Sequence, residues 1–157
     1  MTDGVEIERK FLVDRPPDGL DSFPSGEIEQ GYLAITDDVE VRVRRYGERS
    51  FLTVKSSGDE SRVEEEIEID GRRFGALWPL TEGRRIEKRR YRIPTGDDLT
   101  IELDVYQHRL AGLMTAEVEF GSRADADKFT PPPWLGREVT EDSRYKNKRL
   151  ATSGLPS

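Results

Sequence analysis

The sequence predicts a mainly β protein, an antiparallel sheet or barrel of about eight strands with a few short helices. The first observation is that apolar and charged residues alternate with a period of two along one short stretch after another, which is typical of strands with two different faces. The second is that segments rich in Gly, Pro and Asp separate these stretches. Many strands with short connections favour an antiparallel arrangement.

Five strands are expected in the first half of the chain. The first spans 5–13 and is followed by a loop over 14–26 that is rich in Pro, Gly and Asp. The second spans 28–35, and in the third the valines at 39, 41 and 43 alternate with charged residues. A turn at 46–48 joins the third strand to the fourth, at 51–55, as a hairpin. The fifth runs from about 62 to 69, with glutamates at 64, 66 and 68 on one face.

Three strands and two helices are expected in the second half. A helix over 74–80 is indicated by apolar residues at helical spacing before Pro79. Strands follow at 86–93, 99–106 and 114–120, and Ser122 is a candidate N-cap for a short helix that ends before Thr130. No structure is assigned to the polar tail over 134–150. We expect one domain over 1–157, with a core from about 5 to 150 and a short disordered tail at 152–157.

Composition excludes several classes of protein. Residues are 36% charged and 34% hydrophobic, and the apolar ones cluster in periodic runs, so a folded domain is expected. The absence of cysteine excludes disulfides, thiolate zinc sites and a cysteine nucleophile. A net charge of −7 argues against nucleic acid as a partner. No membrane span or signal peptide is visible, so we expect a soluble cytoplasmic protein with no membrane partner, and a homodimer is left open.

Charged residues of the same sign recur two positions apart on the predicted strands. A spacing of two places both members of a pair on one face of a strand. A solvated surface is the simplest interpretation of any single pair, but such surfaces usually mix signs along and across strands. The repeated pattern therefore indicates a site for a polyanion and its metal ions. The pairs are Glu6 and Glu8, Arg42 and Arg44, Glu64 and Glu66, Lys88 and Arg90, Glu102 and Asp104, and Glu117 and Glu119.

The ordered set of residues resembles the CYTH superfamily, the triphosphate tunnel metalloenzymes. The segment 6–10 fits the N-terminal ExExK signature of that family, and the match extends over about 5–150, including the tail at 134–140 and 144–151. The resemblance implies a closed eight-stranded antiparallel β-barrel with a charged lumen and helices packed outside. It also implies binding of a triphosphate, which is hydrolysed or cyclised with a divalent metal. The tunnel-lining positions are matched by Arg42, Arg44, Lys55, Glu64, Glu66, Lys88, Arg90, Asp104, Glu117 and Glu119.

Basic residues are the candidates for substrate binding, and acidic residues are the candidates for metal binding. Arginine makes bidentate contacts to phosphate oxygens, and carboxylate oxygens select hard cations, so Mg²⁺ or Mn²⁺ is the expected cofactor. The substrate-binding candidates are Lys10, Arg42, Arg44, Lys55, Lys88 and Arg90, and the resemblance adds Arg144 and Lys146 in the tail. The metal-binding candidates are Glu6, Glu8, Glu117 and Glu119, with Glu64, Glu66 and Asp104 as further or outer ligands.

The resemblance implies that Lys10 acts as a general base, with Tyr32 as its partner. The neighbouring Glu6 and Glu8 argue against this role, because their charges raise the pKa of a lysine unless bound metal and other bases lower it. A metal-activated water or a carboxylate is the alternative.

The expected function is metal-dependent hydrolysis of inorganic triphosphate to pyrophosphate and phosphate. Thiamine triphosphate and nucleoside triphosphates are alternative substrates, and a class IV-type adenylate cyclase is the alternative enzyme. Two non-enzymatic hypotheses remain: a polyphosphate-binding protein without turnover, and an acidic β-domain that binds a protein through its charged face.

Overall fold

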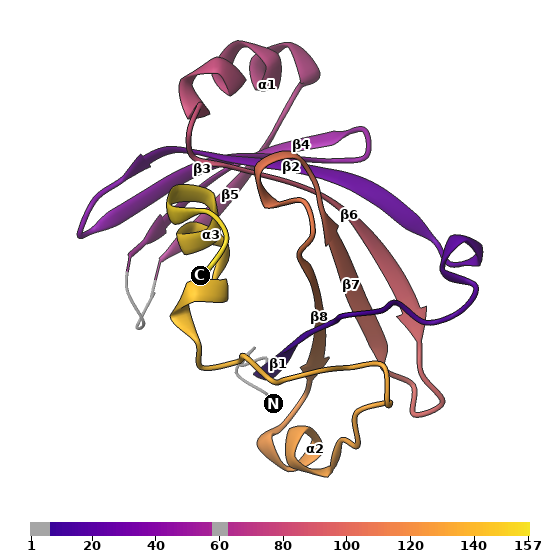
Figure 1. The fold of residues 1–157 in the computed structure, drawn as a ribbon. Coiled ribbons are helices and arrows are strands. Elements are labelled where there is room, and N and C mark those ends of the chain that lie inside the picture. Colours follow the sequence, from indigo (N-terminus) through magenta and orange to yellow (C-terminus); the bar gives the residue numbers. More distant parts are fainter. Residues whose placement is uncertain (1–6, 58–62) are drawn as a thin grey trace.

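A computed structural model of the protein describes residues 7–57 and 63–157, which form one eight-stranded sheet with antiparallel pairing throughout (Figure 1). The order across the sheet is β1-β8-β7-β6-β2-β3-β4-β5. Each strand predicted from the alternation is present. The strands are β1 (Ile7–Leu12), β2 (Ser25–Ile35), β3 (Val39–Tyr46), β4 (Arg49–Ser56), β5 (Glu64–Ile69), β6 (Arg85–Pro94), β7 (Thr100–Tyr106) and β8 (Met114–Phe120).

Short helices connect and flank the strands. They are α1 (Gly71–Leu77), α2 (Arg123–Lys128) and α3 (Asn147–Ser153), with 3-10 turns η1 (Leu20–Ser22), η2 (Trp78–Thr81), η3 (His108–Leu110) and η4 (Ser143–Tyr145). The helix expected over 74–80 begins earlier, because the Asp70 side chain accepts a hydrogen bond from the Arg73 N–H at 2.8 Å and caps it. Ser122 caps α2 as expected, accepting from the Asp125 N–H at 3.1 Å. Helix α3 begins in the tail over 134–150, to which the sequence assigned no structure, and it continues through Thr152 and Ser153, which were expected to belong to a disordered tail.

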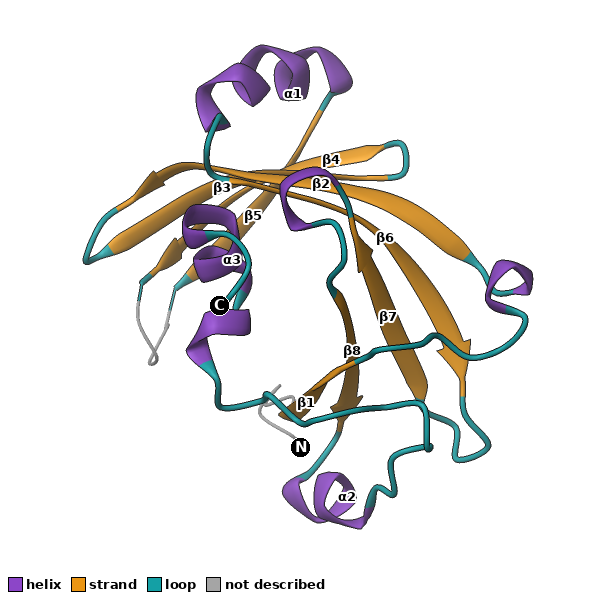
Figure 2. Cartoon of the chain, in the orientation of Figure 1, coloured by secondary structure: helices purple, strands orange, loops and turns teal. Residues whose placement is uncertain are grey.

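The sheet curves so that one face is concave (Figure 2). Helix α1 contacts β3 and β4, and α2 contacts β1 and β8. These two helices agree with the expectation of helices outside the sheet. Helix α3 contacts β2 and β6 and lies on the concave side instead, which the sequence did not predict.

The expected closure of the sheet into a barrel is not confirmed. Strands β1 and β5 are the two edges of the sheet, and no pairing joins them within the described residues. The free edge of β1 is occupied by the C-terminal segment 136–139. Leu12 donates its N–H to the Arg137 carbonyl at 2.9 Å, and Val139 donates to the Lys10 carbonyl at 2.8 Å. These bonds satisfy edge groups of β1 that would otherwise be open to pairing with β5.

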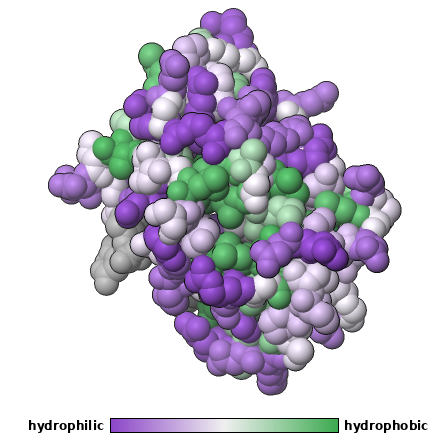
Figure 3. Space-filling view, in the orientation of Figure 1, coloured by the Kyte–Doolittle hydropathy of each residue, from purple (hydrophilic) through white to green (hydrophobic). Residues whose placement is uncertain are grey.

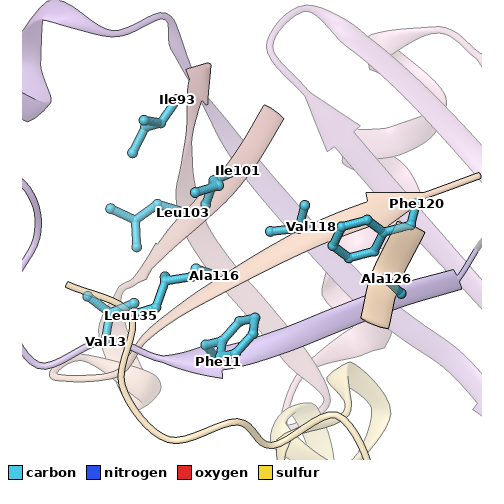
Figure 4. Close-up of a cluster of buried hydrophobic side chains, with 10 residues drawn as sticks. All are labelled: Phe11, Val13, Ile93, Ile101, Leu103, Ala116, Val118, Phe120, Ala126 and Leu135. Carbon is cyan, nitrogen blue, oxygen red and sulfur yellow. The ribbon is translucent and has the colours of Figure 1, made fainter. Parts of the chain in front are cut away.

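The main hydrophobic core lies on the convex side of β1, β8, β7 and β6 (Figure 4). Its members alternate with the charged residues of the same strands: Leu103 precedes Asp104, and Val118 follows Glu117. The loop before β2 and the segment after α2 cover this core, with Phe129 packing between Phe11 and Phe120. Because the apolar phase of these strands is buried on the convex side, the charged phase faces the concavity. The core residues are Phe11, Val13, Ile93, Ile101, Leu103, Ala116, Val118, Phe120, Ala126 and Leu135.

No helix within residues 7–57 and 63–157 is both long enough and apolar enough to cross a membrane.

Candidate active site

The centre of the concave face carries the arginines of β3. Arg42 and Arg44 are half-buried, and their Nε atoms are buried without a hydrogen-bond partner within the described residues. Burial, followed by the charges of Arg90 and Arg42, lowers the pKa of the Arg44 guanidinium. Buried donors without partners are costly, and so are cations held close together. An anion bound beside these arginines would relieve both costs.

A second group of bases comes from β6 and is organised by a buried carboxylate. Asp104 on β7 is 1% exposed, and it pairs with Lys88 Nζ at 2.7 Å and Arg90 Nε at 2.8 Å. Burial opposes ionisation, but the charges of Lys88 and Arg90 outweigh it and lower the pKa of Asp104 to about 2. Arg90 also approaches Glu102 at 3.5 Å. Asp104 therefore fixes two cations on the concave face next to the arginines of β3.

Acidic residues gather on β1 and β8. Glu8 is opposite Glu119 in the register, and Lys10 is opposite Glu117. Burial of the Glu8 carboxyl, together with the charges of Glu117 and Glu119, raises the pKa of Glu8 to about 7, and a side-chain hydrogen bond joins Glu8 to Glu117. Such a bond between two carboxyl groups requires a proton on one of them, and a cation can take the place of that proton.

The remaining predicted acids are more dispersed. Glu6 lies outside the described residues. Glu64 and Glu66 are exposed on the edge strand β5, where Glu66 accepts a hydrogen bond from Thr53 Oγ1 at 3.2 Å. Within the part of the chain that the structure describes, no three acidic or histidine side chains converge on one position suited to a metal ion. The carboxylates of β1 and β8 are thus the set that best fits a cation, with Glu6 two residues from Glu8 in the sequence.

Lys10 and Tyr32 have different neighbours. Lys10 Nζ donates to the Tyr145 carbonyl and lies 3.5 Å from Glu117 Oε1. Tyr32 is 1% exposed, and its hydroxyl accepts a hydrogen bond from Gln30 Nε2 at 3.2 Å. Burial raises the pKa of Tyr32, although the nearby charge of Arg42 opposes this effect. The tyrosine therefore belongs to the side of the site formed by β2 and β3, and the lysine to the side formed by β1 and the C-terminal segment.

The tail places a different base in the concavity from those expected. Arg144 is exposed, with its guanidinium bound to Asp142 Oδ1 at 3.0 Å and Oδ2 at 2.7 Å, and Lys146 is also exposed. Lys148 on α3 instead pairs with Glu40 on β3 at 2.8 Å. Lys148 belongs to the basic tail that the resemblance implies could contact phosphate, although Arg144 and Lys146 are the candidates chosen there, and Glu40 is not among the predicted site residues. Glu40 was detectable, because it shares the period-two phase of the β3 arginines, whereas the tail carries no periodic signal.

The ends of the concave face differ in character. One end is filled by an apolar cluster that includes Leu150 and Ala151 of α3. On the surface, Figure 3 shows apolar side chains in the middle of this view with hydrophilic ones around them. At the other end of β6 and β7, a cavity of about 520 Å³ is lined in part by Arg92, Glu102 and Glu119. The site is thus closed by hydrophobic packing at one end and bordered by charged side chains at the other. The cluster comprises Tyr32, Ile86, Tyr106, Leu110, Leu150 and Ala151.

Comparison with known proteins identifies the family. Residues 4–152 match the CYTH domain. The chain belongs to the CYTH family. An inorganic triphosphatase of Nitrosomonas europaea is 54% identical over 151 residues, which cover 95% of this chain and 98% of the relative. An inorganic triphosphatase of Acetivibrio thermocellus is 39% identical over 150 residues, covering 94% of this chain and 93% of the relative.

A solved structure supports the same assignment for this CYTH protein. The crystal structure of an inorganic triphosphatase superposes with a TM-score of 0.81 at 49% sequence identity, covering 97% of each chain. The superposition extends over nearly the whole length of the chain.

Proposed function

We propose that this CYTH protein is an inorganic triphosphatase, which hydrolyses tripolyphosphate to pyrophosphate and phosphate. The observation that carries the proposal is that the buried Nε atoms of Arg42 and Arg44 have no hydrogen-bond partner among the described residues and lie in the concavity that also holds Lys88 and Arg90. Four cations on β3 and β6, the two strands that flank β2, match a compact polyanion. The names of the close relatives support the same substrate.

The bases bind and orient the phosphates in this proposal. Arg42 and Arg44 donate to phosphate oxygens, with their planar guanidinium groups suited to bidentate contacts. Lys88 and Arg90 are held by Asp104, so their charges are fixed before substrate enters, and no reorganisation is needed as negative charge develops. Asp104 serves as the anchor of these two cations. Lys55, which lies 3.8 Å from Glu40, adds a further positive charge beside Arg42.

The metal is Mg²⁺ or Mn²⁺ in this proposal, held by Glu8, Glu117 and Glu119 together with Glu6. The raised pKa of Glu8 supports this assignment, since the charges of Glu117 and Glu119 oppose its ionisation in the absence of a positive partner. When bound, a divalent cation neutralises phosphate charge and lowers the pKa of water. Glu64 and Glu66 on β5 face the same side as Thr53 and Lys55 and are proposed as outer ligands.

Lys10 and Tyr32 are proposed to act at opposite sides of the phosphate chain. Lys10 Nζ donates to the Tyr145 carbonyl and lies beside Glu117, and as an ammonium ion it would stabilise negative charge on the substrate. The raised pKa of Tyr32 keeps its hydroxyl protonated at neutral pH, so it acts as a hydrogen-bond donor. A carboxylate of the β1 and β8 group is then the candidate base for water.

A phosphate-release screen tests the function. Purified protein is incubated with tripolyphosphate, ATP, thiamine triphosphate or pyrophosphate, each with Mg²⁺, Mn²⁺ or Ca²⁺. We expect the fastest release of orthophosphate from tripolyphosphate with Mg²⁺ or Mn²⁺, and no release without a divalent ion. Formation of cyclic AMP and pyrophosphate from ATP would favour the cyclase instead, and binding of tripolyphosphate without release under any condition would favour a pure binding protein.

A further inference from the structure

We propose that Glu40 limits the length of the polyphosphate chain that the site accepts, so that three phosphates fit well and a fourth does not. The inference rests on the proposed triphosphatase function and assigns its chain-length specificity to one carboxylate.

Glu40 is a buried acid in a predominantly basic part of the concavity. It is 5% exposed, and its two oxygens have separate partners: Oε1 lies 2.8 Å from Lys148 Nζ, and Oε2 lies 3.8 Å from Lys55 Nζ. A carboxylate is rarely buried without paired cations, and here those cations come from α3 and β4. Both ammonium groups are therefore directed at Glu40, and its negative charge offsets part of theirs.

The register along β3 sets the distance between this acid and the phosphate-binding arginines. Glu40, Arg42 and Arg44 share one face of the strand, and two residues along a strand span roughly 7 Å. A triphosphate aligned with Arg42 and Arg44 occupies the interval between these side chains. A fourth phosphate extended in this direction would come next to Glu40.

The surroundings of Glu40 leave a longer chain no favourable continuation. Tyr32 is paired with Arg42 in the register and belongs to the apolar cluster that fills this end of the site, together with Leu150 of α3. A phosphate entering here would face a carboxylate at close range and would have to compete with it for Lys148 and Lys55. Like charges in a poorly solvated site repel strongly, so the additional phosphate costs more than it gains.

The same geometry predicts what removal of the charge would do. In a Glu40→Gln variant, the shape of the side chain is kept, the repulsion is removed, and Lys55 and Lys148 become available to a fourth phosphate. The variant should therefore gain activity toward tetrapolyphosphate relative to tripolyphosphate. A Glu40→Asp variant keeps the negative charge and should keep the preference for three phosphates.

The experiment compares kcat/KM for tripolyphosphate and tetrapolyphosphate with Mg²⁺ in the wild type and in the Glu40→Gln, Glu40→Asp and Glu65→Gln variants. Glu65 is an exposed acid on β5 that lies in the opposite phase to Glu64 and Glu66, and it serves as the matched control. We expect the ratio of tetrapolyphosphate to tripolyphosphate activity to rise roughly tenfold or more in Glu40→Gln, the effect of one charge-assisted contact. Glu40→Asp and Glu65→Gln should retain the wild-type ratio.

The outcomes separate this inference from the function on which it rests. A wild type that cleaves tetrapolyphosphate as efficiently as tripolyphosphate overturns the inference without any variant. The inference can therefore be tested even if the Glu40→Gln variant does not fold. An unchanged ratio in a Glu40→Gln protein with normal melting overturns it as well. Failure of the wild type to cleave tripolyphosphate would instead overturn the proposed function.

Discussion

Individual side chains on the concave face are kept in states that a ligand would relieve. Within the described residues, the Nε atoms of Arg42 and Arg44 have no hydrogen-bond partner, and burial together with the charges of Glu117 and Glu119 raises the pKa of Glu8. Each arrangement costs stability in the free protein, because buried donors and crowded like charges are unfavourable. Sites that bind tightly charged ligands commonly hold such groups in place before the ligand arrives.

Replacing Arg42 tests the role of the β3 arginines in binding the phosphates. Arg42→Ala should lower kcat/KM for tripolyphosphate by about ten- to hundredfold, since a hydrogen bond to a charged group contributes roughly 1.5–3 kcal/mol. Arg42→Lys should recover only part of this loss, because an ammonium cannot make the bidentate contact. Steady-state phosphate release measures the effect, with the exposed Arg72→Ala on α1 as a control of equal charge change. Equal losses in both variants would mean that only net charge matters.

The raised pKa of Glu8 predicts that the affinity of the site for a divalent cation depends on pH. Because its pKa is raised from 4.5 to about 7, the cost of Glu8 to the stability of the folded state grows between about pH 4.5 and pH 7 and is constant above, and a cation must displace a proton below pH 7. The apparent affinity for Mg²⁺ should therefore increase from pH 6 to pH 8, and the Mg²⁺-induced rise in Tm should be larger at pH 8. Glu8→Gln should flatten both dependences in calorimetric titration and thermal melting. A wild-type affinity that stays constant over this range would argue against a raised pKa of Glu8 at the metal site.

Among the elements, the strands were predictable and the C-terminal segment was not. Alternation in β3, with valines opposite charged residues, defines both the strand and its faces. Helix α3 carries no such pattern: its buried residues Leu150 and Ala151 are adjacent, and its position depends on contacts with distant β2 and β6. Barrel closure is not confirmed for a related reason: residues 136–139 occupy the edge of β1, and no pattern in their sequence predicts this contact.

Two leucine substitutions, one at a buried position of α3 and one at an exposed position after it, test how α3 packs. Leu150 is completely buried in the apolar end of the site, whereas Leu155 is 46% exposed. Leu150→Ala should lower the free energy of unfolding by about 2–5 kcal/mol, the usual cost of truncating a buried leucine, and Leu155→Ala should change it by less than about 0.5 kcal/mol. Urea denaturation followed by circular dichroism measures both values. A small effect at Leu150 would show that α3 does not close this end of the site in solution.

At the scale of the whole molecule, one sheet brings together two sets of charges that need different ligands. Acids of β1 and β8 lie on the same concave face as bases of β3 and β6, although the protein as a whole has a net charge of −7. A cation alone approaches the acids against the field of the bases, and a polyphosphate alone meets the reverse repulsion. The two ligands should therefore bind cooperatively, each removing the cost of the other.

Thermal melting measures this coupling directly. The rise in Tm with tripolyphosphate and Ca²⁺ together should exceed the sum of the rises with each alone, provided that Ca²⁺ supports little turnover. A ligand that binds only the folded state stabilises it by RT ln(1 + [L]/Kd), so a lower Kd for each ligand in the presence of the other adds to the shift. Separate titrations of each ligand in the presence and absence of the other should give the same coupling factor in both directions. An Arg42→Ala Glu8→Gln double variant should lose most of the coupling while retaining the cooperative melt of the fold. Strictly additive shifts in the wild type would mean that the two sets of charges act as independent sites, in conflict with a single site for a metal-bound triphosphate.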